Sequence, residues 1–479
     1  MSRANRAILA VLIAAACLAS ALNARAADAP PPLDKKLRQE IIEGTCAQLE
    51  STYVEADTAK MIASVLRKKL KSGGYDKYTD RNEFGLAVTK DLRSLNGDLH
   101  LSLRPGGASA GSGGAPVTVR RVVGGPDSGG AAAGGVPVII RRTTGAPGGP
   151  GGPGGPGGPG GRPIPGLPDP IEHNFGLERA EILPGNIGYL EVTGFNEGPG
   201  FEDAMAAALH FLERTNAMII DVRHNPGGSG NMSHMLFSHF LPADSIPTIR
   251  VKSRDRAMPQ LMHSFVNVPG PRRPDVPLYV LTSRRTGSAA EEFSFVLHNL
   301  KRATLVGERT AGAGHMVGFK DVPDGFVLGV SITRVSDART GAEWEAVGVP
   351  VDHAVDADRA LTVAQQDALK LLADRASDPE RKKRLAWTAD WVAADDRPQP
   401  TQAELSRLVG RFDEDRTVAV EDGKLVYKRG PMSEVLRPLG NDGYMLMPEA
   451  RITFDAGSPA PGFTIERLDG SSTKVARVK

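Results

Sequence analysis

The feature that most constrains this chain is a strand-like apolar run that leads through a serine-containing turn into a helix. Residues 277–282 are almost entirely apolar, and residues 286–293 read Thr-Gly-Ser-Ala-Ala-Glu-Glu-Phe. Beyond the turn, apolar residues recur at helical spacing. They are Ala290, Phe293, Val296, Leu297 and Leu300. Strands that alternate with helices in this way predict a layered α/β domain.

Ser288 stands at the start of the predicted helix. The free N–H groups and the positive dipole end of a helix favour a developing oxyanion, and acyl-transfer chemistry places a nucleophile in such a position. The alternative is that Ser288 is an ordinary helix N-cap.

Two further segments favour the interpretation of Ser288 as a nucleophile. Residues 218–230 read as a buried strand, a glycine loop and a helix start, and residues 302–314 contain a second glycine-rich segment. Together with Ser288 they resemble the catalytic core of the S41 family, the C-terminal-processing (tail-specific) and tricorn-type serine proteases. The resemblance covers residues 185–355 and extends more loosely to the N-terminal region. It implies a ClpP/crotonase-like ββα-superhelix core. Apolar residues at helical spacing predict a helical N-terminal domain before that core. Nothing in the sequence implies a cofactor.

The general base differs from that of the C-terminal-processing branch. That branch uses a lysine in a Thr-x-Gly-Lys-Gly segment, but residues 310–314 here read Thr-Ala-Gly-Ala-Gly, with Ala313 at the lysine position. No lysine lies between Lys301 and Lys320. The chain is more similar to the branch without a PDZ module, which includes the tricorn core and interphotoreceptor retinoid-binding protein. In that branch a histidine sits in an Asp-x-His-x pattern, which implies that His100 is the base.

The same resemblance implies an orienting carboxylate before a Gly-Val-x-Pro-Asp segment. Glu345 takes that place, and Glu343 is the fallback. His315 follows the second glycine segment, and it is either an alternative base or a residue that lines the substrate cleft. The other histidines have no metal-ligand spacing, so no metal site is predicted.

The oxyanion hole is expected to combine the N–H of Ala289 with that of Gly227 or Gly228. Glycines in this loop let backbone N–H groups approach a ligand closely. Asp221 and Arg223, which come just before them, are expected to hold the loop rather than to act chemically.

The N-terminus has the pattern of a cleaved secretory signal, with basic residues, an apolar run and a small-x-small site that ends at Ala26. The apolar run is too short for a stable membrane span. A periplasmic or secreted location follows. After cleavage only Cys46 of the chain's 2 Cys remains, so no intrachain disulfide is expected. The net charge of +2 gives no reason to expect a nucleic-acid partner.

The sequence divides into segments of different composition. Short strands and Asp-Gly turns near the C-terminus predict a small antiparallel β domain. The predicted parts are a signal peptide 1–26, a helical N-terminal domain 33–104, a Gly/Pro-rich low-complexity insert 105–168, a catalytic core 169–357, a helical segment 358–397 and a β domain 401–479.

The predicted function is that of a serine endopeptidase that acts on a protein or peptide substrate. The principal alternative is a catalytically inactive module of the same fold that binds an apolar ligand or a peptide. A crotonase-like acyl-CoA enzyme is a weaker alternative, because no nucleotide site accompanies the glycine loop. The substrate, the oligomeric state and the roles of the insert and of the β domain are left open.

Overall fold

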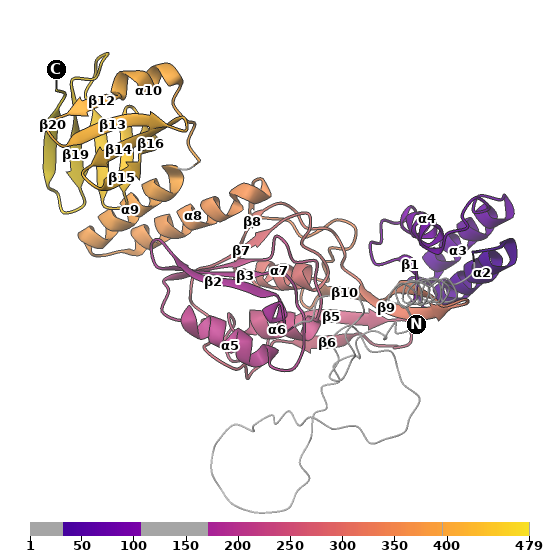
Figure 1. The fold of residues 1–479 in the computed structure, drawn as a ribbon. Helices are drawn as coiled ribbons and strands as arrows, with labels where there is room; N and C mark the ends of the chain where they lie inside the picture. The colour runs from indigo at the N-terminus through magenta and orange to yellow at the C-terminus, as the bar shows by residue number, and fades with distance from the viewer. Residues whose placement is uncertain (1–31, 107–170, 395, 479) are drawn as a thin grey trace, which may run out of the picture. The chain divides into compact units, whose positions relative to one another are not determined.

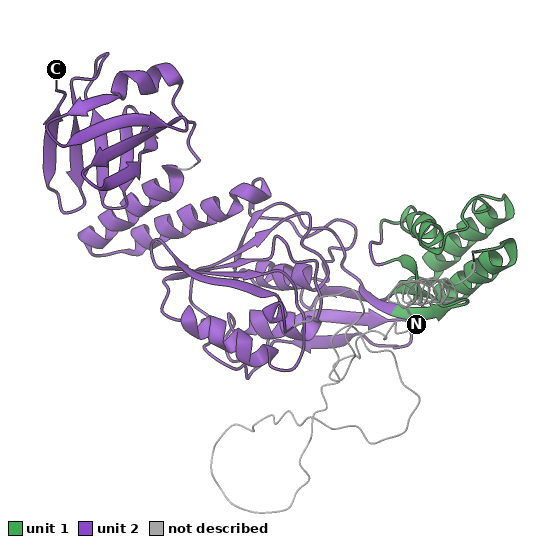
Figure 2. Cartoon of the chain, viewed as in Figure 1, with its two compact units in different colours: residues 1–97, 101–108, 319–330 green, residues 98–100, 109–318, 331–479 purple. Residues whose placement is uncertain are grey.

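The computed structural model describes residues 32–106, 171–394 and 396–478. The predicted signal peptide and residues 107–168 of the predicted insert lie outside the described residues. By compactness the chain forms two units (Figure 2). Unit 1 contains residues 1–97, 101–108 and 319–330, and unit 2 contains residues 98–100, 109–318 and 331–479.

Unit 1 begins with helices that bury a stripe of apolar residues, as the helical spacing predicted (Figure 1). They are α2 (Lys35–Thr52), α3 (Ala56–Lys71) and α4 (Arg81–Arg93). Asp34 caps α2 by accepting the N–H of Leu37, and Asp80 caps α4. Cys46 is a buried free thiol on α2. The N-terminal region is therefore helical, and the sheets of the remaining chain make the whole fold mixed α/β.

Unit 2 is built on a six-stranded sheet with the strand order β11-β8-β7-β4-β3-β2. The edge strand β2 is antiparallel to β3, and the remaining neighbours are parallel. The strands are β2 (Leu177–Leu183), β3 (Ile187–Val192), β4 (Ala217–Asp221), β7 (Leu278–Thr282), β8 (Thr304–Gly307) and β11 (His353–Ala354).

Both faces of this sheet are covered, which explains why every residue of β4 and β7 is buried. Met218 and Ile220 of β4 belong to one apolar cluster, which also includes residues of α5 (Phe201–Phe211), α6 (Gly230–Ser238) and α7 (Ala289–Asn299). Ile219 belongs to a second cluster with α8 (Ala360–Arg375). The result is a layered arrangement with helices on each side of the sheet.

A second sheet has the order β1-β10-β5-β6, with β9 also paired to β10. The long strand β10 passes from unit 1, at residues 326–330, into unit 2, at residues 331–337. The hairpin of β5 and β6 and the strand β9 were not predicted from the sequence. The bounds are β1 (Ser102–Pro105), β5 (Pro247–Ser253), β6 (Gln260–His263), β9 (Met316–Val322) and β10 (Phe326–Asp337).

The C-terminal part of unit 2 consists of α9 (Pro379–Ala394), α10 (Gln402–Leu408) and two antiparallel sheets. An apolar cluster that includes Phe412, Phe454 and Phe463 forms the core of the two sheets. The first sheet has β12 (Gly410–Phe412), β13 (Arg416–Glu421), β14 (Lys424–Arg429) and β15 (Met432–Val435). The second has β16 (Arg437–Gly440), β17 (Gly443–Met447), β18 (Ala450–Phe454), β19 (Gly462–Arg467) and β20 (Ser472–Ala476).

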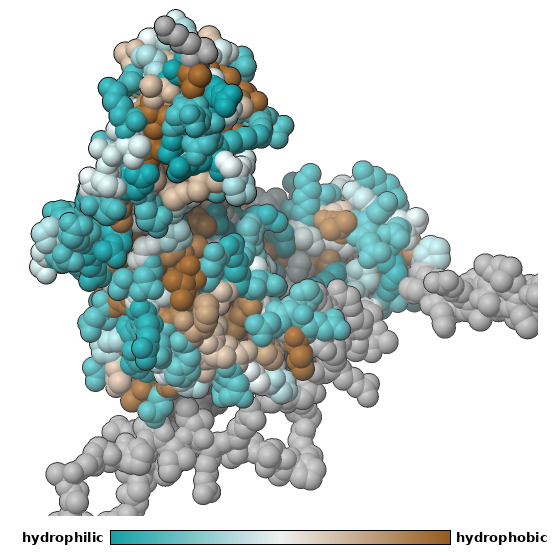
Figure 3. Space-filling view, turned by 60° about the vertical axis from the view of Figure 1, so that its left-hand side comes forward, coloured by the Kyte–Doolittle hydropathy of each residue, from teal (hydrophilic) through white to brown (hydrophobic). Residues whose placement is uncertain are grey.

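On the face shown in Figure 3, hydrophobic side chains appear as limited groups among hydrophilic ones. No helix within the described ranges combines the length and apolarity that a bilayer crossing requires.

Candidate active site

The candidate site lies where three neighbouring parallel strands end. β4, β7 and β8 are adjacent in the sheet, so the loops that follow them meet at one edge. The hydroxyl of Thr286 donates to the carbonyl of Val222 at 2.8 Å, and the N–H of Gly287 donates to the carbonyl of Asn225 at 3.0 Å. The N–H of Ala311 in turn donates to the carbonyl of Thr286 at 3.0 Å. These bonds join the three loops into one scaffold.

Ser288 occupies a strained turn between β7 and α7. Its backbone has φ 51° and ψ −120°, a conformation that costs non-glycine residues about 1–3 kcal/mol. Strain of this kind persists where the surroundings fix it, and it is concentrated at functional sites. The side chain is half-buried, so it remains accessible to a ligand.

Glu291 connects the Ser288 turn to the third loop. Its carboxylate is fully buried and accepts the N–H groups of Ser288 at 2.9 Å, Gly312 at 2.6 Å and Ala313 at 2.7 Å. It also accepts the hydroxyl of Thr310 at 2.5 Å. Burial raises the pKa of Glu291, although these hydrogen bonds favour the ionised form. Glu291 therefore fixes the positions of the serine turn and of the 310–314 loop together.

The glycine loop lies against the serine turn. A Cβ on Gly227 would lie 2.7 Å from Cβ of Ser288 and 3.1 Å from the backbone nitrogen of Ala289. The N–H of Gly227, however, donates to Oδ1 of Asn225 at 2.8 Å. Gly228 is exposed, and neither its N–H nor that of Ala289 has an acceptor among the described residues. Of the predicted oxyanion donors, these two are available to a substrate.

Asp221 and Arg223 hold the loop that follows β4. The guanidinium of Arg223 contacts both carboxylate oxygens of Asp221, at distances between 2.6 and 3.1 Å. Tyr189 donates its hydroxyl to Asp221 at 2.7 Å. Arg223 also donates to the carbonyl of Ala357 at 2.6 Å.

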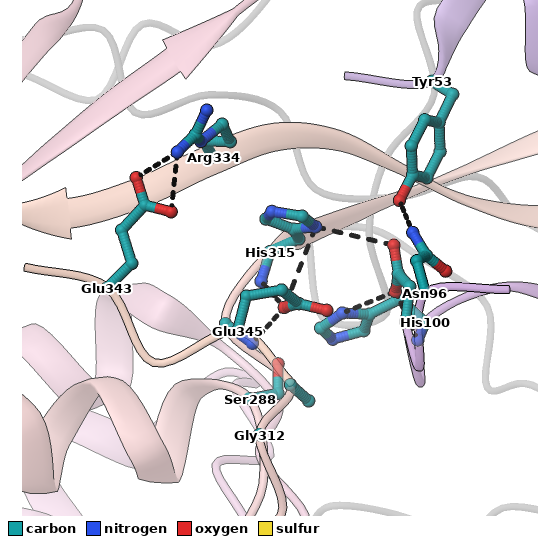
Figure 4. A network of polar contacts seen from close by, with 12 residues as sticks. Tyr53, Asn96, His100, Ser288, Gly312, His315, Arg334, Glu343 and Glu345 are labelled. Carbon is teal, nitrogen blue, oxygen red and sulfur yellow. Dashed lines mark hydrogen bonds and ion pairs between the residues drawn. The ribbon is translucent and has the colours of Figure 1, made fainter. Parts of the chain in front are cut away.

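A second group of polar residues surrounds His315 (Figure 4). Nδ1 of His315 is 3.5 Å from Oδ2 of Asp98 and 3.7 Å from Oε2 of Glu345. The Glu345 carboxylate is held in place by the N–H groups of Gly314, at 2.6 Å, and of His315, at 2.8 Å. In Figure 4 the hydroxyl of Ser288 points toward the side of this network where Glu345 and His100 lie.

His100 lies beside Asp98, in the turn that precedes β1. Its Nδ1 is 3.9 Å from Oδ1 of Asp98, and its backbone N–H donates to the same oxygen at 2.9 Å. Although the helices around it in sequence belong to unit 1, the segment 98–100 belongs to unit 2, the unit that also contains Ser288 and Glu345.

The buried ionisable groups of this network shift one another's pKa values. Burial raises the pKa of Glu345 to about 7, and the charge of Asp98 adds to that effect. Burial also acts to raise the pKa of Asp98, but the interactions with His315, Ser331 and His100 together outweigh it and lower the value to about 2. Burial alone would lower the pKa of His315, but Asp98 and Glu345 raise it above its ordinary value. Perturbed groups in one cluster are typical of functional sites.

The structure separates Glu343 from this network, because its carboxylate pairs with Arg334 at 2.7 Å (Figure 4).

The sequence analysis assigned no role to Glu291, Asn225 or Asp98. For Glu291 a signal existed, because a glutamate three positions after a serine at a helix start is typical of a capping box.

Comparison with known proteins gives the family of the central segment. Residues 186–355 match the family model described as Peptidase family S41. This segment belongs to peptidase family S41. The resemblance inferred from the serine turn and the two glycine segments is thereby confirmed.

Two curated relatives match about a third of this chain. The carboxyl-terminal-processing protease of Synechocystis sp. is 34% identical over 151 residues, which are 31% of this chain and 33% of the relative. The carboxy-terminal processing protease CtpA of Bacillus subtilis is 27% identical over 168 residues, which are 34% of each chain. The chain thus spans about a third of the length of the curated relatives it matches.

Among solved structures, the photosystem II D1 C-terminal processing protease is similar to this chain. It is 24% identical with a TM-score of 0.31, over 37% of this chain and 45% of that protein.

Proposed function

We propose that this chain is a serine endopeptidase of the S41 type, with Ser288 as nucleophile, His100 as general base and Glu345 as orienting carboxylate. The observation that carries the proposal is the strained backbone of Ser288 at the start of α7, next to the glycine loop. The match to peptidase family S41 covers this turn, and the named relatives are proteases.

The reaction would begin when Oγ of Ser288 attacks the carbonyl carbon of a peptide bond. His100 would take the serine proton, because a free hydroxyl is hardly ionised at neutral pH. The N–H groups of Gly228 and Ala289 would stabilise the negative oxygen of the tetrahedral intermediate. The intermediate would then break the C–N bond as His100 returns the proton to the leaving amine.

The resulting acyl-enzyme would be hydrolysed by water, with His100 again acting as base and Ser288 as the leaving group. Glu345 is supported as the orienting group because two backbone N–H groups fix its carboxylate within the His315 network. Ala313 supports a histidine base rather than a lysine, since it stands at the expected lysine position and is buried.

We further infer that the core has the ClpP/crotonase-like superhelix, which the alternation of strands and helices from β3 to β8 supports. We also propose a periplasmic or secreted location, on the basis of the signal pattern in residues 1–26. Its test is the N-terminal sequence of the exported protein, which should begin at Ala27. An uncleaved N-terminus on a cytoplasmic protein would refute it.

The function is tested by reaction of the purified chain with a fluorophosphonate and by cleavage of casein. We expect one covalent label on Ser288 and no label or cleavage in Ser288→Ala. Ser294→Ala is the matched control, because Ser294 lies on the same helix and donates to the carbonyl of Ala290. A folded wild-type chain that neither reacts nor cleaves would instead support the inactive binding module.

A further inference from the structure

Three potential metal-ligand atoms from distant parts of the sequence lie together in unit 2. One ligand atom each from Asp98, His315 and Glu345 lies within 4.8 Å of the other two. The sequence analysis predicted no metal site because it considered only local histidine spacing. These residues are more than 200 positions apart at the extremes, so no local motif contains them.

The distances within this cluster suit a metal better than direct hydrogen bonding. Nδ1 of His315 is 3.5 Å from Oδ2 of Asp98 and 3.7 Å from Oε2 of Glu345, whereas charge-assisted hydrogen bonds are about 2.7–2.9 Å long. Around a tetrahedral zinc ion with bonds of about 2.0–2.1 Å, ligand atoms are about 3.3 Å apart. Both distances from His315 are within about 0.4 Å of that spacing, and no two of the three ligand atoms are more than 4.8 Å apart.

A second observation points to a missing ligand. Oε1 of Glu345 is buried and has no hydrogen-bond partner among the described residues. The other oxygen of this carboxylate already accepts two backbone N–H groups, which hold the group in place. A buried carboxylate oxygen without a partner is costly, and a cation would satisfy it.

The donor set favours a particular class of ion. Mg²⁺ and Ca²⁺ prefer sites built entirely from oxygen ligands. One imidazole nitrogen and two carboxylates suit Zn²⁺, which leaves a fourth position for water. The side chains of Asp98 and His315 are 1% and 9% exposed, so the site is largely shielded from solvent.

We propose that Asp98, His315 and Glu345 bind Zn²⁺ and that the bound ion inhibits the peptidase. The inhibitory part rests on the proposed function, because it assumes that Glu345 is the orienting carboxylate. A bound ion would engage that carboxylate and also Asp98, whose Oδ1 lies 3.9 Å from Nδ1 of His100. The ion would thereby take Glu345 out of the arrangement that the proposed mechanism requires.

Binding is measured first, by calorimetry with Zn²⁺ and by the visible absorption of Co²⁺, on the metal-stripped full-length chain carrying Ser288→Ala. We expect one ion per chain. His315→Ala and Glu345→Gln should each weaken binding by at least about tenfold. Glu345→Gln keeps an oxygen that can accept the backbone N–H groups, so it tests the ligand without removing the scaffold.

His298→Ala is the matched control, because His298 forms a comparable pair with Asp352, at 3.3 Å, outside the cluster. The His298→Ala variant should bind Zn²⁺ with the same affinity as the Ser288→Ala parent chain. Absence of binding, or equal affinity after His315→Ala, would overturn the site.

Inhibition is measured separately, with Zn²⁺ added to the wild-type chain during casein cleavage. We expect activity to fall as the site fills and to return on chelation, with the same behaviour in His298→Ala. Full activity at saturating Zn²⁺ would overturn the inhibitory role. A wild-type chain that binds the ion but cleaves nothing under metal-free conditions would refute the proposed function and leave the metal site standing.

Discussion

The carboxylate of Glu291 accepts the backbone N–H of Ser288 at 2.9 Å and, through the same oxygen, the N–H of Ala313 at 2.7 Å. One side chain therefore fixes both the Ser288 turn and the backbone of Ala313, the position at which the C-terminal-processing branch is expected to have a lysine. The other oxygen accepts Thr310 and Gly312. This explains how a residue with no direct chemical role can determine the geometry of the site.

Glu291→Gln should lower kcat by about 10–100-fold and destabilise the fold by about 1–3 kcal/mol, because the amide NH₂ would face groups that donate. KM should change less. Casein cleavage and thermal unfolding measure the two effects. Glu434→Gln, on the exposed strand β15, is the control and should be silent. Wild-type kcat in Glu291→Gln would show that the bond to Ser288 is dispensable.

Gly227→Ala should reduce kcat at least about 100-fold, because the new methyl group would press on Ser288 and displace the N–H of Ala289. The backbone φ of 114° adds strain for any residue with a Cβ. Gly230→Ala is a matched control, since a Cβ there would meet nothing within 4 Å. Equal loss in both variants would mean that the loop tolerates no substitution, whatever its distance from Ser288.

His100→Ala should lower kcat by about 10²–10⁴-fold, the usual contribution of a general base. The fluorophosphonate reaction of Ser288 should slow in parallel. His224→Ala, at an exposed histidine 3.6 Å from Glu191, should retain wild-type kinetics. If His100→Ala turns over normally while His315→Ala is inactive, His315 is the base and the assignment is wrong.

Stability should fall as the pH drops below about 6.5, in part because of His239. Burial lowers the pKa of this residue from 6.5 to about 4, and Nδ1 is 2.8 Å from the carbonyl of Pro271. Between these pH values the unfolded chain binds the proton and the folded chain does not, so acidification favours unfolding. The full effect is about 3 kcal/mol, reached near pH 4.

His239→Gln keeps a donor for Pro271 but cannot titrate. Its thermal midpoint should therefore fall less than that of the wild type between pH 7 and pH 5, since other titrating groups are common to both chains. Parallel pH curves would show that His239 does not contribute.

The parts of the site that are formed by residues close together in the chain could be predicted from the amino-acid sequence alone. The Ser288 turn and the glycine loop are strand-to-helix junctions, and their apolar periodicity and glycines are visible without a structure. Asp221 and Arg223 were likewise assigned correctly to the loop, because they are two residues apart. The fold prediction was correct in its mixed α/β character and its C-terminal β sheets.

The remaining features depend on contacts between distant segments. The pairing of Asp98 with His315 joins residues 217 positions apart. The hairpin of β5 and β6 was missed because β6 is only four residues long and places its two apolar residues, Leu261 and Met262, next to each other instead of alternating them.

The position of the short segment 98–100 in the sequence limits how such a chain can exchange parts by recombination. The segment is grouped with unit 2, which contains Ser288, yet its neighbours on both sides in sequence belong to unit 1. A recombination event that replaced everything before residue 171 would keep Ser288 and the glycine loop but discard Asp98 and His100. On the proposed mechanism the two parts are therefore not interchangeable modules, because a relative that acquired a foreign N-terminal half would need a new proton acceptor in place of His100.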